Sequence, residues 1–587
     1  MRAGSLILSR LGKWSSRAFW SLGNGLGGRL FCGGDETEKA LDNCLGARAA
    51  RAVGLGEKVI APYKDAIAEG AFQSRLFLFA DRFRKAFFLT KVRFFGIAGL
   101  LFALYSLAGF FLYQFFSFSY SRTSLADLIL GAAVLAGSVV LLFVGKPAGE
   151  CLAGSRLFGR LFIGVLGIDP GSLRQTTGQP MSHGALAFVI GTVWGVAGIF
   201  LAPHRVVLWT VQLIFAILIL AVPETGLLSA VLLMPVCSLD VTAAFVAATL
   251  VSYFIKLIRL KRTIRLRVPE TMMLLMLLSV FLASRGSFAG EDAGRIFLTY
   301  LLFGCVWFLT VNLVKTGTLY RKLIACLMYG GMTTLVLTGA GFLLQAFRLD
   351  DWHALLPQSM LAQSVLGMYL VILVPVTLLH GKRWSGLAML ALVALNAYFL
   401  QSMWVWFGIL ASVLVYLVFA KRALFESVLA GVILIPMFVI AAGNRLGAFS
   451  VRISESAGAL AREYWLCGLG LGERVLAVGA AANGLVPDGF SANLYERMIL
   501  EGGAVHLLLF LLAAAFSLQY VFTAMRNTQS GNAKTICGGI AAAVLMFLAC
   551  GFATDVGADL RVIGLFWCLC PAASLAKDLY GRKPEDP

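Results

Sequence analysis

The feature that most constrains this chain is a succession of sixteen apolar runs, most of them long enough to cross a bilayer as a helix. A spanning helix needs about 20 mostly apolar residues, and its hydrogen bonds satisfy the backbone where no water is present. Composition agrees, because 59% of the residues are hydrophobic and 13% are charged, whereas a soluble domain is about half apolar and about a quarter charged. The sequence therefore predicts an all-α, polytopic integral membrane protein with about 14–16 transmembrane helices. The predicted spans are 94–116, 125–145, 184–202, 206–222, 226–237, 241–258, 270–286, 295–314, 322–345, 359–379, 385–400, 403–420, 424–442, 504–525, 535–553 and 560–577.

Basic side chains predict how these spans are oriented. Lysine and arginine collect in the cytoplasmic loops of membrane proteins, and the densest basic stretch here is Lys256–Arg267. With sixteen spans, this stretch, the other basic connectors and both termini fall on one side, which we expect to be cytoplasmic. The net charge of +19 then follows from topology, and we expect no nucleic-acid partner. The connectors expected outside are 117–123, 287–292, 347–358, 443–503 and 554–559.

The N-terminal region differs in composition from the spans. Residues 1–93 carry 16 Lys and Arg against 8 Asp and Glu, which predicts a basic cytoplasmic or interfacial region. Its stretches 6–22 and 72–88 mix aromatic and basic residues, which fits either helices on an anionic membrane surface or a small cytosolic cap. The remaining regions are expected to be extra N-terminal spans at 94–225, a main membrane domain at 226–577 and a short cytoplasmic tail at 578–587.

The longest polar segment, 443–503, is the expected external loop and the expected place of any chemistry. A connection of this length is usually functional or disordered, and its aromatics and short apolar stretches argue against disorder. An external site has no access to ATP or nucleotide sugars, so lipid-linked donors are the expected substrates. Arginine suits a diphosphate because its planar fork pairs with phosphate oxygens, although five arginines beside five glutamates also fit a solvated helical loop. The arginines are Arg445, Arg452, Arg462, Arg474 and Arg497.

The order of residues in this loop favours the functional interpretation. Arg452 begins a helical stretch, and Asn493-Leu-Tyr495 and Glu501-Gly-Gly503 lead into the next apolar run. Between them lies a triplet of alternating glycines, Gly468, Gly470 and Gly472. Together these segments resemble the O-antigen ligase and polymerase superfamily of bacterial envelope glycosyltransferases. In that superfamily an arginine, a G-x-G-x-G element and a His-Asn-x-Tyr-(x)5-Glu-x-Gly segment follow one another in an external loop.

The resemblance covers roughly Leu227–Lys577, and Pro357–Ala362 with Tyr369–Pro375 is similar to a further upstream segment of the superfamily. It implies a metal-independent inverting transfer without a cofactor, in which an acceptor hydroxyl attacks the anomeric carbon of a glycan carried on a polyprenyl diphosphate. It also implies a protein of the bacterial cytoplasmic membrane whose partners are membrane lipid and envelope polysaccharide assembly proteins.

The resemblance further implies roles for individual residues. Arg452 would stabilise the charge that develops on the diphosphate, and Arg462 would contribute to substrate binding. The backbone amides of Gly468–Gly472 would cradle phosphate or sugar, unless the glycine triplet is a tight packing corner. Asn493 and Tyr495 would orient sugar hydroxyls, and Glu501 would act as a base or cap the next helix, because a carboxylate is favoured at a helix start.

Two departures from the family pattern affect this chemistry. Ala492 stands where the family has a histidine that activates the acceptor, and Met403 stands where it has a second arginine. A transfer to carbon benefits from a base that removes the hydroxyl proton. We therefore expect another residue to supply it, with Glu501 first, His506 second and His353 third.

Three alternatives stay open. Asp350, Asp351 and His353 in an outward connector would allow a divalent metal site, although adjacent aspartates diverge and a solvated turn is favoured. A flippase or transporter for lipid-linked glycans would also have many spans, but transporters place charges at mid-membrane and carry internal repeats, and neither is evident here. A catalytically inactive member is favoured by Ala492 and Met403. The expectation we carry forward is a glycan polymerase or ligase acting on polyprenyl-diphosphate-linked sugars at the external face.

Overall fold

The computed structural model describes most of the chain between residues 86 and 580. The predicted span at 424–442, most of the external loop and residues 1–85 lie outside the described part. The described residues are 86–116, 125–155, 159, 184–237, 239–258, 264–287, 290–346, 363–378, 383–400, 403–419, 463–472, 494–553 and 560–580.

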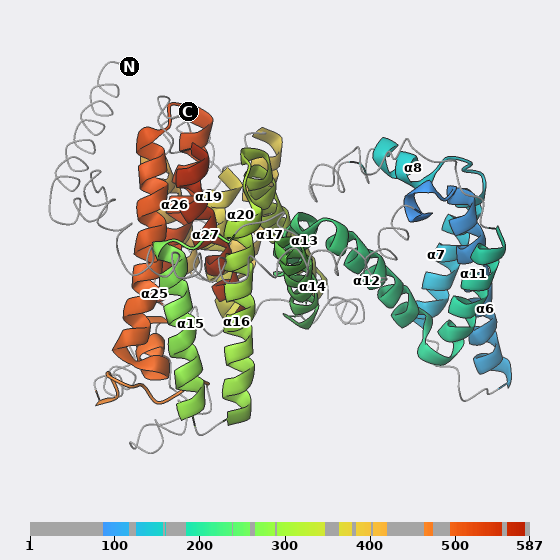
Figure 1. Ribbon diagram of the computed structural model, residues 1–587, viewed down its shortest axis with the longest axis horizontal. Helices are drawn as coiled ribbons and strands as arrows, with labels where there is room; N and C mark the ends of the chain where they lie inside the picture. The colour runs from blue at the N-terminus through green and yellow to red at the C-terminus, as the bar shows by residue number, and fades with distance from the viewer. Residues whose placement is uncertain are drawn as a thin grey trace. The chain divides into compact units, whose positions relative to one another are not determined.

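Every named element of secondary structure in these described residues is an α-helix (Figure 1). Ten of the helices are long and apolar enough to cross a membrane, and four shorter apolar helices accompany them. Each predicted span that falls on described residues coincides with a helix, which confirms an all-α, polytopic membrane protein. The helices are α6 (Val92–Phe116), α7 (Leu125–Leu142), α8 (Ala148–Gly154), α11 (Gly184–Leu201), α12 (Pro203–Ala221), α13 (Pro223–Leu233), α14 (Leu239–Ile258), α15 (Val268–Gly286), α16 (Gly290–Leu313), α17 (Gly317–Ala346), α19 (Gln363–Leu378), α20 (Arg383–Leu400), α21 (Met403–Phe419), α25 (Leu494–Asn527), α26 (Gly531–Ala553) and α27 (Leu560–Tyr580).

One difference from the predicted spans concerns the helix that follows the external loop. The apolar run predicts a start at residue 504, but α25 begins at Leu494. Its first turns carry charged residues, which a criterion based on hydropathy alone rejects. These turns are nevertheless helical. Their two buried charges, Arg497 and Glu501, form an ion pair across one helical turn, which offsets the cost of burying them.

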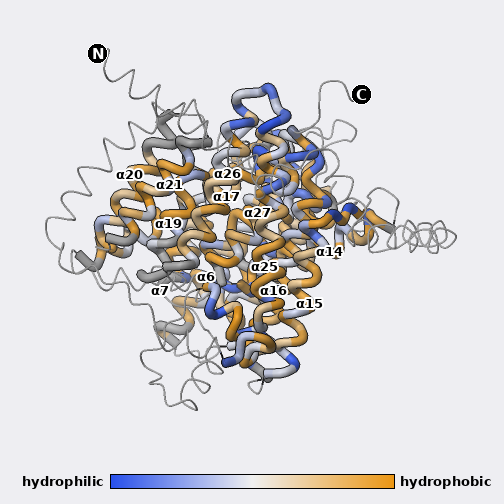
Figure 2. Tube along the Cα trace, turned by 90° about the vertical axis from the view of Figure 1, so that its left-hand side faces the viewer, coloured by the Kyte–Doolittle hydropathy of each residue, from blue (hydrophilic) through white to orange (hydrophobic). Residues whose placement is uncertain are grey.

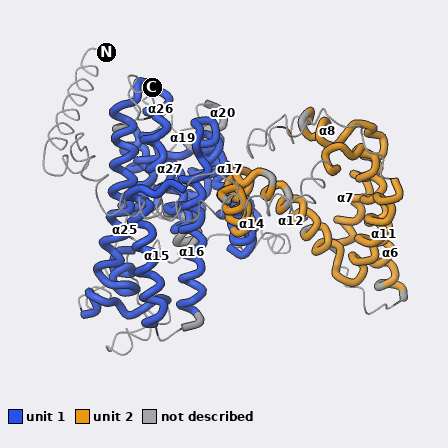
Figure 3. The backbone as a smooth tube through the Cα atoms, in the orientation of Figure 1, with its two compact units in different colours: residues 1–61, 230–246, 263–587 blue, residues 62–229, 247–262 orange. Residues whose placement is uncertain are grey.

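The described helices fall into two compact units (Figure 3). The smaller unit comprises residues 62–229 and 247–262, and in it α6 packs against both α7 and α11. Small residues permit this approach, because a Cβ added at Gly191 of α11 would lie 2.7 Å from the carbonyl oxygen of Ala98. At the start of α12, the Asp127 carboxylate accepts the backbone N–H of His204 at 3.0 Å and lies 2.8 Å from Nδ1 of that residue. This pair ties α12 to α7.

The larger unit, which includes residues 230–246 and 263–587, is built around α27. In α27, 83% of the membrane-spanning window is buried, a larger share than in any other candidate span among the described helices. Trp567 lies edge-on to Trp307 of α16, with ring centroids 5.7 Å apart. Phe566 packs against Phe510 of α25 and Phe547 of α26, at 4.8 Å and 4.6 Å. Aromatic contacts of this kind hold α16, α25 and α26 against one central helix.

The two ends of α15 lie in different surroundings. At its first turn, the Arg267 side chain pairs with Asp578 of α27, and the Arg267 backbone N–H donates to Glu270 Oε2 at 2.9 Å. At its other end, Ser287 lies against Gly470 and Leu471 of the 443–503 segment. Figure 2 shows hydrophobic residues along the middles of the helices and hydrophilic residues toward their ends. Arg267 and the described residues of the 443–503 segment therefore lie at opposite ends of α15.

Candidate functional site

The site is built on a bend in α25. At Gly503 the backbone has φ 78° and ψ −178°, so α25 consists of one helix before this residue and another after it. A break in the i→i−4 ladder leaves backbone donors and acceptors without helical partners. In a membrane protein such groups must bond elsewhere, because lipid offers them no partner.

The partners come from Glu463–Gly472, which we call the glycine segment. The Leu469 N–H donates to the carbonyl oxygen of Leu500 before the bend at 2.5 Å. The Ala504 N–H after the bend donates to the carbonyl oxygen of Trp465 at 2.6 Å. The glycine segment is therefore bonded backbone to backbone to the residues on either side of Glu501-Gly-Gly503.

Glycine is required where the two backbones meet. Gly468 has φ +70°, and a Cβ added there would lie 2.8 Å from the Gly502 nitrogen. A Cβ added at Gly503 would collide with the carbonyl oxygen of Leu466. Both residues also have positive φ, a region that other residues rarely adopt. Gly468 therefore lies at a tight packing corner between the glycine segment and α25.

The rest of the glycine segment reaches the ends of α15 and α16. A Cβ added at Gly470 would lie 3.0 Å from Cα of Ser287, and one at Gly472 would lie 3.6 Å from Cδ1 of Ile296. The Gly468 N–H donates to the Tyr464 carbonyl oxygen at 2.9 Å. With Leu469 also engaged, two amides of the expected phosphate cradle already have protein acceptors. The amides of Gly470–Gly472 have no acceptor among the described residues.

Two arginines that no sequence motif marks, Arg285 and Arg295, border this end of the segment. Arg285 lies near the end of α15, two residues before Ser287, and its guanidinium carbon is 5.3 Å from the ring of Phe281. Arg295 lies in the first turns of α16, next to Ile296. Both side chains are exposed. Because they sit in apolar helices rather than in the polar loop, only the fold associates them with the glycine segment.

A buried ion pair lies one turn before the bend. Arg497 Nε is 2.9 Å from Glu501 Oε1, and the two residues are only 8% and 2% exposed. A buried carboxylate without a counter-charge is strongly unfavourable, so Arg497 stabilises Glu501 in this position. Among the arginines of the 443–503 segment, Arg497 has no role that the family resemblance implies. Its spacing of four residues from Glu501 was the signal that could have assigned one.

His506 lies three residues after the bend and is 1% exposed. Its Nδ1 is 2.7 Å from Oγ of Ser279 on α15. Gly502 makes room for it, because a Cβ there would lie 2.8 Å from Cβ of His506. Nε2 of His506 is buried and has no hydrogen-bond partner within the described part of the chain. A buried, unbonded polar atom costs about 1–3 kcal/mol, so its presence calls for an explanation.

Tyr495 lies near the start of α25 and fastens it to α26. Its hydroxyl donates to the carbonyl oxygen of Leu548 at 2.6 Å. The hydroxyl proton of Tyr495 is therefore engaged in this hydrogen bond, and the hydroxyl oxygen could only accept a hydrogen bond from a sugar. Tyr495 thus has a structural contact in addition to any contact with substrate.

The other predicted site residues lie outside the described residues. These are Arg452, Arg462 and Asn493, and with them Asp350, Asp351 and His353 of the metal alternative. Among the residues that the structure does describe, no group of three or more His, Cys, Asp or Glu side chains could hold a metal ion. The metal alternative therefore stays a prediction.

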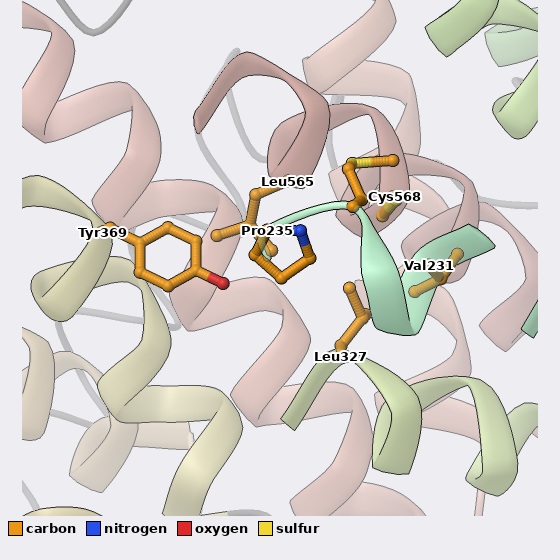
Figure 4. Close-up of a pocket in the computed structure, with 7 residues that line it drawn as sticks. Val231, Pro235, Leu327, Tyr369, Leu565 and Cys568 are labelled. Atoms are coloured by element: carbon orange, nitrogen blue, oxygen red, sulfur yellow. The ribbon is translucent and has the colours of Figure 1, made fainter. Parts of the chain in front are cut away.

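A small pocket in the larger unit is unrelated to these residues (Figure 4). It lies between α13, α17, α19 and α27 and contains the upstream residue Tyr369. Its lining includes no charged side chain, so it does not suit a diphosphate. The lining residues are Val231, Met234, Pro235, Leu327, Tyr369, Leu565 and Cys568.

Comparison with known proteins adds no assignment. No family model matches this chain, and no curated protein matches it. A functional interpretation therefore rests on the loop motifs and on the geometry around Gly503.

Proposed function

We propose that this chain is a bacterial glycosyltransferase of the glycan polymerase or ligase type, which transfers sugars from a polyprenyl diphosphate to an acceptor hydroxyl outside the cytoplasmic membrane. The observation that carries the proposal is the bonding of the glycine segment to the bend at Gly503. Two separate motifs of the resemblance meet there, at the end of α15 opposite the basic connector. A lipid-linked donor would have its diphosphate at such a membrane boundary and its glycan in water.

The reaction in this proposal is a single displacement. The acceptor oxygen forms a bond to the anomeric carbon, the bond from that carbon to the diphosphate breaks, and the diphosphate leaves with the electron pair. Positive charge at the diphosphate lowers the barrier because charge develops there. Arg452 and Arg462 would supply it, with Arg285 and Arg295 bordering the glycine segment. The amides of Gly470–Gly472 would donate to phosphate or sugar oxygens.

The geometry favours His506 over Glu501 as the base in this reaction, which reverses the order expected from the sequence. Glu501 Oε1 already accepts a hydrogen bond from Arg497 Nε, so this carboxylate oxygen is engaged within the protein. Nε2 of His506 has no described partner and can receive one. We therefore assign Glu501 to holding the first part of α25 in place and His506 to proton transfer.

The proposal is tested with the full-length protein in lipid vesicles that contain polyprenyl-diphosphate-linked glycan extracted from membranes of the source cells. Transfer predicts loss of the lipid-linked glycan, release of polyprenyl diphosphate and a longer or newly attached glycan on electrophoresis. Movement of the intact donor between leaflets without consumption would instead identify a flippase. Binding of the donor with neither consumption nor movement would identify an inactive member.

A further inference from the structure

The hydroxyl of Ser279 determines how His506 is protonated. Ser279 Oγ lies 2.7 Å from the carbonyl oxygen of Met276 and 2.7 Å from Nδ1 of His506. A hydroxyl has one proton, and a carbonyl oxygen can only accept. The Ser279 proton therefore goes to Met276, since two oxygens at this distance without a proton between them would repel. Oγ is left to accept, so Nδ1 of His506 must carry a hydrogen.

The other ring nitrogen then follows from this assignment. In a neutral imidazole with hydrogen on Nδ1, Nε2 carries a lone pair. No described residue donates to that lone pair, and the atom is buried. A base whose second nitrogen is held by a hydrogen-bond acceptor is the arrangement that activates hydroxyl nucleophiles in enzymes. In this protein Ser279 is the group that orients the imidazole ring.

We infer that Ser279 is a positioning residue that holds His506 in the form with hydrogen on Nδ1, so that Nε2 takes the proton of the acceptor hydroxyl. This inference rests on the proposed glycosyl transfer. As the acceptor oxygen bonds to carbon, its proton passes to Nε2 and the ring becomes an imidazolium that still donates from Nδ1 to Ser279. The proton later leaves to the released diphosphate or to water, which restores the neutral ring.

The state described here is closed around Nε2. The side chain is 1% exposed, so an acceptor hydroxyl reaches the nitrogen only when its neighbours move. The glycine segment covers the bend three residues before His506 and is held to α25 by the two backbone bonds at Leu469 and Ala504. Within a water-excluded site, the incoming hydroxyl would supply the donor that Nε2 lacks.

The protonation state can be read without any turnover. The full chain contains only five histidines, so histidine labelled with ¹⁵N in lipid nanodiscs gives few ring signals, and the His506→Gln variant identifies those of His506. We expect a hydrogen on Nδ1 and none on Nε2. Ser279→Ala should give a mixture of the two neutral forms, and Ser279→Thr, which keeps the hydroxyl, should restore the original one. A hydrogen on Nε2 in the unaltered protein would overturn the inference.

Turnover in the same preparations separates this inference from the proposed function. His506→Gln should lower the rate by roughly 10²–10⁴-fold, the contribution of a positioned base. Ser279→Ala should lose part of that factor, and Ser279→Thr should regain it. Ser284→Ala is the matched control, because Ser284 Oγ makes the same bond to a carbonyl three residues earlier, Phe281 at 2.7 Å, on the same helix.

The outcomes are distinguishable. Transfer that is unaffected in His506→Gln and Ser279→Ala would reject the base and leave the proposed function intact. Absence of transfer in the unaltered protein would reject the proposed function and the base role together, whatever the ring signals show. An equal loss of rate in Ser284→Ala and Ser279→Ala would assign Ser279 to helix structure only.

Discussion

Replacing Gly503 by alanine tests whether the bend and the glycine segment form one structural unit. The backbone at this residue, φ 78° and ψ −178°, lies in a region that is essentially restricted to glycine. The added methyl carbon would also meet the carbonyl oxygen and carbon of Leu466, the latter at 2.6 Å. The chain then has two responses, which are to keep a strained backbone or to release the segment.

The cost of each response can be estimated. Keeping these angles with a side chain costs about 1–3 kcal/mol, to which the collision with Leu466 adds. Releasing the segment loses the bonds of Leu469 and Ala504, at about 0.5–1.5 kcal/mol each. Release is therefore the lower-cost response, and it should weaken the attachment by about 1–3 kcal/mol. This range corresponds to hydrogen exchange that is roughly 5-fold to 150-fold faster at the two amides.

Hydrogen exchange followed by mass spectrometry on peptides covering 463–472 and 500–506 would measure this effect. Gly294→Ala is the control, because nothing lies within 4 Å of a Cβ added there on α16. That variant should leave exchange in both peptides unchanged. If Gly503→Ala also left it unchanged in folded protein, the two backbone bonds would not be what holds the segment, and the reasoning from glycine geometry would be refuted.

Three further predictions follow from the same structure and topology. A cysteine introduced at Asp488 should react with an impermeant thiol reagent added outside cells and one at Arg265 should not; the reverse pattern would invert the topology. Arg497→Ala should lower the free energy of unfolding by about 3–5 kcal/mol because it leaves Glu501 buried without a partner, and adding Glu501→Leu should recover most of this loss in thermal unfolding; no recovery would mean that the pair is not coupled. Arg452→Ala should reduce transfer by roughly 10²–10³-fold, with little recovery in Arg452→Lys, whereas normal transfer at an unchanged protein level would show a structural role.

Much of the fold could be predicted from the sequence because each membrane-spanning segment must satisfy its own backbone hydrogen bonds in lipid. An apolar run of sufficient length satisfies its backbone only as a helix, whatever its neighbours are. Thus α26 was predicted at 535–553 and found at Gly531–Ala553, and α19 forms a helix despite Pro375 within it. Hydropathy does not predict the helical turns that carry Arg497 and Glu501, but their spacing of four residues would place them on one face of a helix.

The site could be predicted only in part, because its contacts join segments that no local pattern connects. The glycine triplet and Glu501-Gly-Gly503 were each recognised as motifs, but their backbone bonding depends on the bend at Gly503, which hydropathy does not reveal. Ser279 and His506 lie 227 residues apart, and Ser279 sits in an apolar run with nothing to distinguish it. In lipid, apolar side chains do not select which helices pack together, since lipid tails are equally apolar. The partners of α25, and with them the protonation of His506, were therefore decided by close packing and interhelical hydrogen bonds in the tertiary structure.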